Sequence, residues 1–426
     1  MGRIRTTPLP APAGTGLDHG SSIMRILLAD ALDDQATEAL RAAGHDVVAQ
    51  PDLTADDLAA HVSGHDALVV RSTKVYREAL GAADKLALVV RAGAGTENID
   101  VETASERGIH VCNVPGRNAV AVAELTMGLL LAVDRHIASA TVDARAGVWN
   151  KKRYSKADGL MGRTIAIVGL GAIGLAVAER AKAFGLTVVG LRRPGRTPAT
   201  EGRLRAIGIR LVDEMDELVR SADIISLHVP GGGDTRQLLD AALISNLQDG
   251  AIVLNTSRGD CIDEDALIEA MDTRGVRAGI DVFADEPASG DVEVTSALAR
   301  HPSVVVTHHI GASTRQAQLA IADGVVETIE AYAGGEPVNC INLAPRGTGS
   351  CTLTIRHYDR VGVLAAVFGV LRGAGLNVQH MENRVFLGRT AAVASIDVSA
   401  SPSGEVVEEI LQIPDVLGVS VVESDR

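Results

Sequence analysis

The chain has 426 residues, 46% of them hydrophobic and 2% aromatic, and its formal net charge is −14. This length predicts two or three domains with cores of Val, Leu, Ile and Ala, and the charge argues against nucleic acid or an anionic membrane as a general partner. No run is long enough to span a membrane, and the four cysteines lack metal-type spacing, so we expect a cytoplasmic protein without a metal site.

Residues 1–23 are rich in Gly, Pro, Ser and Thr and lack the apolar segment of a secretory signal, which predicts a disordered extension. From Met24 onward, apolar strands alternate with helical segments, the first of which covers residues 33–43. This alternation is typical of a parallel α/β fold. The strands expected in this first set cover residues 25–29, 67–70, 86–90 and 109–112. Residues 118–145 then predict one long, largely apolar helix.

A second alternating set begins at Arg163. It predicts a doubly wound dinucleotide-binding domain with six strands. These strands cover residues 164–168, 187–191, 223–228, 251–255, 278–282 and 304–307. A linker with Pro and Gly is expected at 342–350, and the remaining residues, 351–426, predict a ferredoxin-like βαββαβ unit. Such a small unit suggests regulation or assembly rather than chemistry.

A glycine-rich turn joins the strand at 164–168 to a helix predicted over residues 176–184. The turn reads Gly169-Leu170-Gly171-Ala172-Ile173-Gly174. The first glycine permits the tight turn, the second lets the backbone approach phosphate, and the third allows close packing of helix and strand. Because the helix N-terminus presents free N–H groups to an anion, this context predicts dinucleotide binding.

Three polar residues stand at or just after the ends of strands in the second set: Arg258, Glu286 and His309. Ligands of open α/β sheets lie outside the carboxyl ends of the strands, so the three side chains can meet in one crevice. Histidine suits proton transfer at neutral pH, a carboxylate raises its pKa, and a guanidinium binds a substrate carboxylate. Each residue alone could be an ordinary surface group, but the set favours oxidation of a hydroxy acid.

These segments resemble the D-isomer-specific 2-hydroxyacid dehydrogenases. The similar stretches are VGLGAIG at 168–174, LNTSRGDCIDEDAL at 254–267, GIDVFADEP at 279–287 and HIGASTRQAQ at 309–318. The resemblance implies that Arg258, Glu286 and His309 are catalytic. It also implies cofactor contacts from Ala172, Ile173, Thr256 and Asp281. It further implies a discontinuous substrate domain at 24–118 and 311–341 around a Rossmann domain at 119–310.

Within this family, the segments at 69–75, 91–100 and 115–132 are most similar to members that oxidise 3-phosphoglycerate in serine synthesis. By that resemblance, Arg71 and Lys74 hold the substrate phosphate and the backbone of residues 93–95 holds its carboxylate. A phosphate needs cationic donors, which agrees with an arginine at a strand end. An exposed, solvated Lys74 is the alternative. The expected substrate-binding residues are Arg71, Ser72, Lys74, Gly93, Ala94, Gly95 and Asn118.

The C-terminal unit resembles an ACT domain through the segment at 357–378, although Val361 replaces the usual proline. The resemblance implies that His357, Asp359 and Asn377 face an amino-acid effector, with serine as the natural candidate. Because such domains pair between subunits, a homo-oligomer is also implied. A unit that only assembles subunits is the alternative.

The strand at 187–191 is followed by Arg192 and Arg193, where NAD-dependent members of the family usually carry an Asp. A carboxylate repels a 2′-phosphate, whereas arginines attract it. We therefore expect NAD(H) or NADP(H) as cofactor, with the arginines favouring NADP. The alternative is that Arg193 points to solvent and Arg192 stacks on adenine.

The first interpretation is therefore hydride transfer between a nicotinamide cofactor and a 2-hydroxy or 2-oxo acid, with 3-phosphoglycerate as the preferred substrate. A reductase of hydroxypyruvate, glyoxylate or another 2-oxo acid is the second. The third belongs to another class, a nicotinamide-sensing binding scaffold. The ACT-like unit and the lack of a basic face argue against this third interpretation.

Overall fold

The computed structural model describes residues 22–286, 293–344 and 350–423. The chain divides into two compact units, at 1–341 and 342–426. Most of the N-terminal extension expected at 1–23, and the centre of the linker expected at 342–350, lie outside the described residues. Within the described part, no helix combines the length and apolar character needed to cross a membrane.

The first sheet is parallel, with strand order β2-β1-β3-β4-β5. Its strands are β1 (Arg25–Leu28), β2 (Asp46–Ala49), β3 (Ala67–Val70), β4 (Leu88–Arg91) and β5 (His110–Asn113). All four residues of β3 are buried, as expected for a strand covered on both faces. The sequence did not predict β2, a short edge strand with no buried residue.

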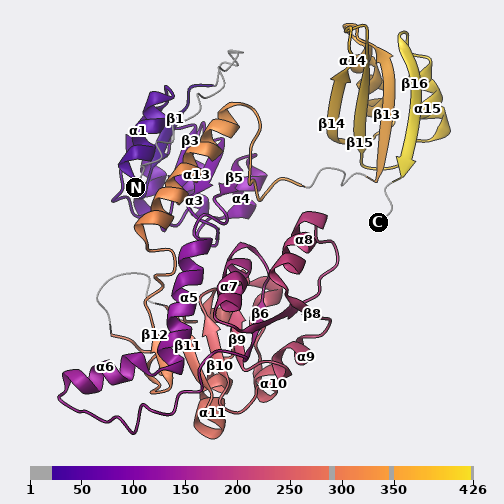
Figure 1. Cartoon of the computed structure of the whole chain (residues 1–426). Coiled ribbons are helices and arrows are strands. Elements are labelled where there is room, and N and C mark those ends of the chain that lie inside the picture. The colour runs from indigo at the N-terminus through magenta and orange to yellow at the C-terminus, as the bar shows by residue number, and fades with distance from the viewer. Residues whose placement is uncertain (1–21, 287–292, 345–349, 424–426) are drawn as a thin grey trace, which may run out of the picture. The chain divides into compact units, whose positions relative to one another are not determined.

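Helices cover both faces of the first sheet (Figure 1). They are α1 (Asp34–Ala42), α2 (Ala55–His61), α3 (Arg77–Ala82), α4 (Val101–Glu106) and α13 (Arg315–Ala333). Although α13 comes far later in the sequence, its Ile321, Val325 and Ile329 pack into the core formed by the first sheet. The chain thus returns to this sheet after completing the second one.

The second sheet has seven parallel strands in the order β12-β11-β10-β9-β6-β7-β8. They are β6 (Thr164–Val168), β7 (Thr187–Leu191), β8 (Arg210–Val212), β9 (Ile224–Leu227), β10 (Ile252–Asn255), β11 (Arg277–Ile280) and β12 (Val304–Val306). Six of these strands were predicted, and the short edge strand β8 was missed. The chain reverses direction across the sheet between β6 and β9, which creates the crevice where doubly wound folds bind ligands.

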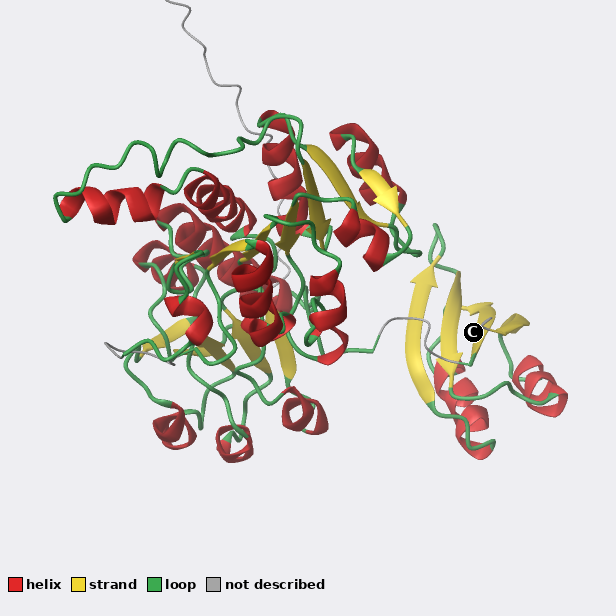
Figure 2. Cartoon of the chain, turned by 90° about the horizontal axis from the view of Figure 1, so that it is seen from below, coloured by secondary structure: helices red, strands yellow, loops and turns green. Residues whose placement is uncertain are grey.

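Helices also flank the second sheet on both faces (Figures 1 and 2). They are α5 (Ala119–Asp134), α7 (Ala172–Ala183), α8 (Pro198–Ile207), α9 (Met215–Arg220), α10 (Ala241–Ser245), α11 (Glu264–Arg274) and α12 (Ala297–Arg300). Short 3₁₀ turns occur at Gly233–Thr235 and Gly259–Cys261.

The single long helix expected at 118–145 is wrong, because α5 ends at Asp134 and a second helix, α6, covers Ile137–Arg145. His136 between them is left-handed, with φ 54°, which breaks the helical path. Asp134 is buried and lies 3.4 Å from the Arg163 guanidinium, so the end of α5 is fixed to the second sheet. Helix α6 has no buried residue and extends away from that sheet (Figure 1).

The C-terminal unit is an antiparallel four-stranded sheet with strand order β14-β15-β13-β16. Its elements are β13 (Cys351–Tyr358), α14 (Val363–Gly373), β14 (Val378–Val385), β15 (Ala391–Val398), α15 (Gly404–Leu411) and β16 (Val416–Glu423). Burial alternates along β13, and its buried residues share a core with α14 and α15. The predicted fold class, two doubly wound sheets and a ferredoxin-like unit, is confirmed.

Candidate active site and nucleotide-binding turn

The turn after β6 has the geometry of a phosphate cradle. Gly169 has φ 99°, and a Cβ there would lie 2.2 Å from the carbonyl oxygen of His228. A Cβ at Gly174 would lie 1.9 Å from the Gly169 oxygen, whereas nothing lies within 4 Å of a Cβ at Gly171. Gly169 and Gly174 therefore allow the tight turn and the close approach of α7, while Gly171 leaves open space before the helix N-terminus at Ala172.

His309 and Glu286 form an ion pair beyond the carboxyl ends of β11 and β12. His309 Nδ1 lies 2.7 Å from Glu286 Oε2, and the Phe283 backbone N–H donates to Glu286 Oε1 at 2.9 Å. The hydrogen bond with Glu286 raises the pKa of His309. Burial is the largest influence on Glu286 and opposes its ionisation, but the hydrogen bond and charge of His309, the Phe283 N–H and Arg258 together outweigh it, so the pKa of Glu286 is lowered. The pair therefore favours an imidazolium beside a carboxylate.

Arg258 follows β10 and completes the predicted set. It interacts electrostatically with both His309 and Glu286, so the structure brings the three side chains together. Arg258 Nε and Nη2 each lie 3.1 Å from Oε1 of Glu97, a residue of the loop after β4. A Cβ at Gly95 would lie 2.3 Å from Arg258 Nη2, so a larger residue there would displace the guanidinium from this position.

Three arginines gather where the loops of the first sheet meet this group. Arg91 interacts electrostatically with Arg258 and Arg71, as well as with the carboxylates of Glu97 and Asp30. Burial and the two neighbouring cations lower the pKa of Arg91, while Glu97 opposes this. Such a cluster of cations beside an acid–base pair suits a small dianionic or trianionic ligand.

Comparisons with known proteins agree with this arrangement. The model of the D-isomer specific 2-hydroxyacid dehydrogenase NAD-binding domain matches residues 127–311. Hydroxypyruvate reductase of Thermotoga maritima is 42% identical over 307 residues, which cover 72% of this chain and 97% of that protein. The chain belongs to the D-isomer-specific 2-hydroxyacid dehydrogenase family.

Other members of this family are also similar. D-3-phosphoglycerate dehydrogenase of Methanocaldococcus jannaschii is 40% identical over 324 residues, 75% of this chain. The match spans only 60% of that protein's length. A solved structure, NAD⁺-bound 3-phosphoglycerate dehydrogenase of Entamoeba histolytica, has a TM-score of 0.61 and 26% identity, and the match covers 75% of this chain and 99% of that one.

Thr256 and Asp281 directly follow the carboxyl ends of β10 and β11. The buried Asp281 carboxylate accepts hydrogen bonds from Thr307 Oγ1 at 2.6 Å and from the N–H groups of Ile310 and Gly311, both at 2.9 Å. Its own carbonyl accepts from the N–H of His309, which is left-handed at φ 52°. Asp281 thus organises the loop that presents His309, and Thr256 Oγ1 lies 2.9 Å from Thr126 Oγ1 on α5.

Arg192 and Arg193 line a pocket at the carboxyl end of β7. The other lining residues are Pro194, Gly195, Arg196, Glu201 and Asp213. Arg192 Nε lies 2.8 Å from Oδ1 of Asp213, an acidic residue that directly follows β8.

The predicted substrate residues come from two loops, after β3 and β4, and from the start of α5. The Arg71 and Ser72 N–H groups both donate to Asp30 Oδ2, at 2.7 and 3.2 Å, while Lys74 is exposed. Gly93 has φ 144° and packs against the Arg91 guanidinium, and the Ala94 carbonyl accepts from Asn113 Nδ2 at 2.6 Å. Asn118 precedes α5, and its Oδ1 is buried with no hydrogen-bond partner among the described residues.

In the C-terminal unit, His357 is 1% exposed, and its Nε2 lies 3.2 Å from Asn383 Oδ1. It therefore lies in the core, whereas Asp359 and Asn377 are both exposed. The Asp359 N–H donates to the Thr390 carbonyl.

Sequence reasoning missed three residues of the candidate site: Asp30, Arg91 and Glu97. A usable signal existed for two of them. Asp30 comes two residues after β1, and Arg91 ends β4, paired in register with Val70 of β3. Arg258 was predicted because ligands of open α/β sheets lie outside the carboxyl ends of the strands, and the same reasoning applies to the first sheet. Glu97 lies in a loop of irregular backbone, and only its contact with Arg258 reveals it.

Proposed function

We propose that this protein transfers a hydride between a nicotinamide cofactor and a 2-hydroxy or 2-oxo acid, and that its substrate is 3-phosphoglycerate. The observation that carries the proposal is the 2.7 Å pair of His309 and Glu286 within electrostatic reach of Arg258. A base, a carboxylate that tunes it and a fixed cation are what oxidation of a secondary alcohol requires.

In this proposal His309 exchanges the hydroxyl proton. Nδ1 donates to Glu286, so Nε2 is the nitrogen left to take the proton from the alcohol or return it to the carbonyl. Glu286 stabilises the imidazolium that results, and Arg258 holds the substrate carboxylate and polarises the reacting oxygen. A nicotinamide dinucleotide, when bound, accepts or supplies the hydride.

The cationic cluster supports a phosphorylated substrate. We assign Arg71, with Lys74, to the phosphate and the backbone of residues 93–95 to the carboxylate, in keeping with the three neighbouring arginines. Reduction of hydroxypyruvate is the second candidate, favoured by the 42% identity to the Thermotoga maritima enzyme over nearly its whole length. A binding scaffold without turnover is the third.

The residues present fit a dinucleotide. The open space at Gly171 and the N-terminus of α7 suit a pyrophosphate, and the pocket at Arg192 and Arg193 suits a 2′-phosphate. Asp213 neutralises Arg192 in part, so Arg193 is the residue we assign to NADP selectivity.

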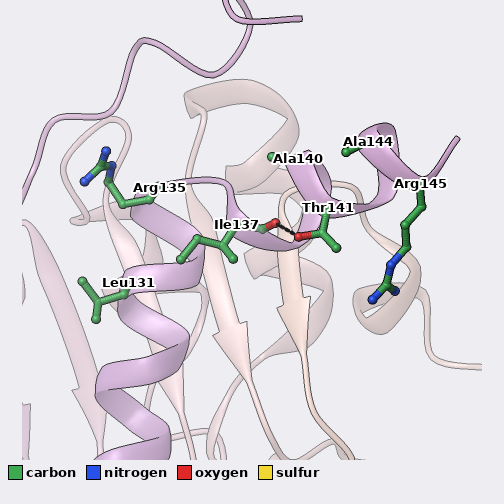
Figure 3. Close-up of a pocket in the computed structure, with 7 residues that line it drawn as sticks. All are labelled: Leu131, Arg135, Ile137, Ala140, Thr141, Ala144 and Arg145. Atoms are coloured by element: carbon green, nitrogen blue, oxygen red, sulfur yellow. Dashed lines mark hydrogen bonds between the residues drawn. The ribbon is translucent and has the colours of Figure 1, made fainter. Parts of the chain in front are cut away.

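We also propose a homo-oligomer that uses helix α6. Ile137 and Val142 of this helix are 52% and 64% exposed, and Trp149 in the following loop is 88% exposed. A shallow pocket runs from the end of α5 along α6 (Figure 3). Its lining residues are Leu131, Arg135, Ile137, Ala140, Thr141, Ala144 and Arg145. Apolar groups rimmed by arginines fit a second copy of this acidic chain.

We place the protein in the cytoplasm, in keeping with its four thiols.

A substrate and cofactor panel with the purified chain tests the function. Turnover of 3-phosphoglycerate, followed through the nicotinamide absorbance, supports the proposal. Turnover of hydroxypyruvate alone selects the second candidate, and no turnover of any 2-oxo acid selects the scaffold. His309→Ala is the matched variant, which loses catalysis while cofactor affinity stays nearly unchanged.

A further inference from the structure

Two cysteines far apart in sequence face each other in the first unit. Cys112 lies on β5, and Cys340 lies in the short segment that leaves α13 toward the end of this unit. They form an isolated antiparallel bridge. The Asn113 N–H donates to the Asn339 carbonyl at 3.2 Å, and the Ile341 N–H donates to the Val111 carbonyl at 2.8 Å. These flanking bonds make the cysteines a non-hydrogen-bonded pair, the type with the closest side chains.

This pairing has the backbone geometry of a disulfide. Cα atoms of a non-hydrogen-bonded pair lie about 4.5 Å apart, within the range of roughly 4.4–6.8 Å that disulfides span. The two thiols already interact, since Cys340 is a hydrogen-bond partner of Cys112. Both side chains also belong to one apolar cluster, so the two segments are already packed against each other.

We propose that Cys112 and Cys340 are a redox modification site that forms an intramolecular disulfide by exchange with a low-molecular-weight disulfide. The Cys340 thiolate attacks one sulfur of the reagent and releases one thiol, which leaves a mixed disulfide on Cys340. Cys112 then attacks the Cys340 sulfur, loses its proton and expels the second thiol. Two protein thiols are oxidised and one reagent disulfide is reduced to two thiols.

The surroundings set this order of events. Cys340 is partly exposed, whereas Cys112 is fully buried. Burial, with a further contribution from Cys340, raises the pKa of Cys112 to about 12, so Cys112 is a poor first nucleophile. The Tyr332 phenol interacts with both thiols and stacks edge-on against His110, so these two rings flank the pair. A reagent therefore reaches Cys340 first.

The bond has a structural consequence. It would fasten residues 339–341, the last of the first unit, to β5, which leads directly into α5. Because the closed loop runs from residue 112 to residue 340, the constraint on the unfolded chain is large. We expect the oxidised protein to unfold at a midpoint at least ~5 °C above that of the reduced protein.

Peptide mapping of the full chain tests the site without reference to its activity. The protein is equilibrated in glutathione redox buffers, quenched in denaturing N-ethylmaleimide and digested with trypsin. Cleavage after arginine places Cys112 in peptide 108–117 and Cys340 in peptide 316–346, each with a single cysteine. The expected product is these two peptides joined, two hydrogens lighter than their sum and separated again by dithiothreitol.

Variants make the result specific. Cys340→Ser and Cys112→Ala each abolish the joined peptide and the rise in unfolding midpoint. Cys340 is the safer position, because it is only partly buried. Cys351→Ala is the matched control, since Cys351 lies in the core of the C-terminal unit and its loss leaves the joined peptide intact. Maleimide on both peptides at every glutathione ratio, or joining to other cysteines, overturns the proposal.

Discussion

Glu97 and Arg258 connect the two parallel sheets at the candidate site. Oε1 of Glu97 accepts a hydrogen bond from Arg258 Nε at 3.1 Å and lies 3.1 Å from Nη2 in an ion pair, although the residues lie on loops that follow β4 and β10. Burial opposes the charge of Glu97, but its backbone hydrogen bond and Arg258 outweigh this, so the pKa of Glu97 is lowered. The carboxylate therefore stays charged at neutral pH and fixes the direction of the guanidinium.

The first prediction concerns this contact. Glu97→Gln removes a charge-assisted hydrogen bond of roughly 1.5 kcal/mol, so kcat is expected to fall about tenfold because Arg258 is less well oriented. KM for the anionic substrate does not rise, since Arg258 loses its competing carboxylate. Steady-state kinetics measure both effects. Glu102→Gln, on the exposed side of α4, is the matched control, and equal kinetics for the two variants would rule out an orienting role for Glu97.

The second prediction concerns pH. The hydrogen bond that His309 donates to Glu286 raises the pKa of His309, so the imidazolium persists to higher pH than in a free histidine. Oxidation needs the neutral base, so its rate rises as pH increases through this pKa, whereas the rate of reduction falls. In Glu286→Gln both limbs move to lower pH. Profiles of kcat/KM in the two directions measure this, and unmoved limbs contradict the pairing.

Much of this fold and site follows from the sequence, for physical reasons. Buried parallel strands are short apolar runs, and glycines at fixed spacing mark a phosphate turn, so β6, the turn at Gly169 and His309 were predictable. Edge strand β2 was not, since it has no buried residue. The break at His136 depends on how Asp134 meets Arg163 in three dimensions, and no local pattern encodes it. Glu97 was not predicted for the same reason, because only its three-dimensional contact with Arg258 reveals it.

The third prediction concerns cofactor choice. Arg193→Ala is expected to lower kcat/KM for NADPH at least ~10-fold with little effect on NADH, because a charge-assisted contact to the 2′-phosphate is lost. Arg192→Ala has a smaller effect, since Asp213 already pairs with Arg192. Arg205→Ala on the exposed face of α8 is the control. A strong preference of the unmodified protein for NAD would defeat the assignment.

The fourth prediction concerns Asp30, which holds the loop that begins at Arg71. Burial opposes its charge, but hydrogen bonds from the N–H groups of Arg71 and Thr73 and from Ser72 outweigh this and lower the pKa of Asp30. The stability that these bonds supply is present above the usual carboxylate pKa of about 4 and is lost as pH falls through the lowered value. Asp30→Asn is expected to lower the free energy of unfolding by about 1 kcal/mol near neutral pH, with a smaller difference in acid. Urea unfolding at several pH values checks this, and a difference that grows in acid contradicts it.

The last prediction concerns the C-terminal unit. If this unit senses an amino acid, millimolar serine lowers turnover, and the change arises through subunit or domain movement rather than through the candidate active site. His357 is buried against Asn383, so an effector meets Asp359 and Asn377 first. Asp359→Ala and Asn377→Ala are expected to relieve the inhibition while kcat without serine stays the same. His357→Ala instead destabilises the core of the unit, which thermal unfolding detects. Turnover that is unchanged at millimolar serine contradicts sensing and assigns the unit to subunit assembly alone. Its two edge strands, β14 and β16, offer unpaired backbone groups for such assembly.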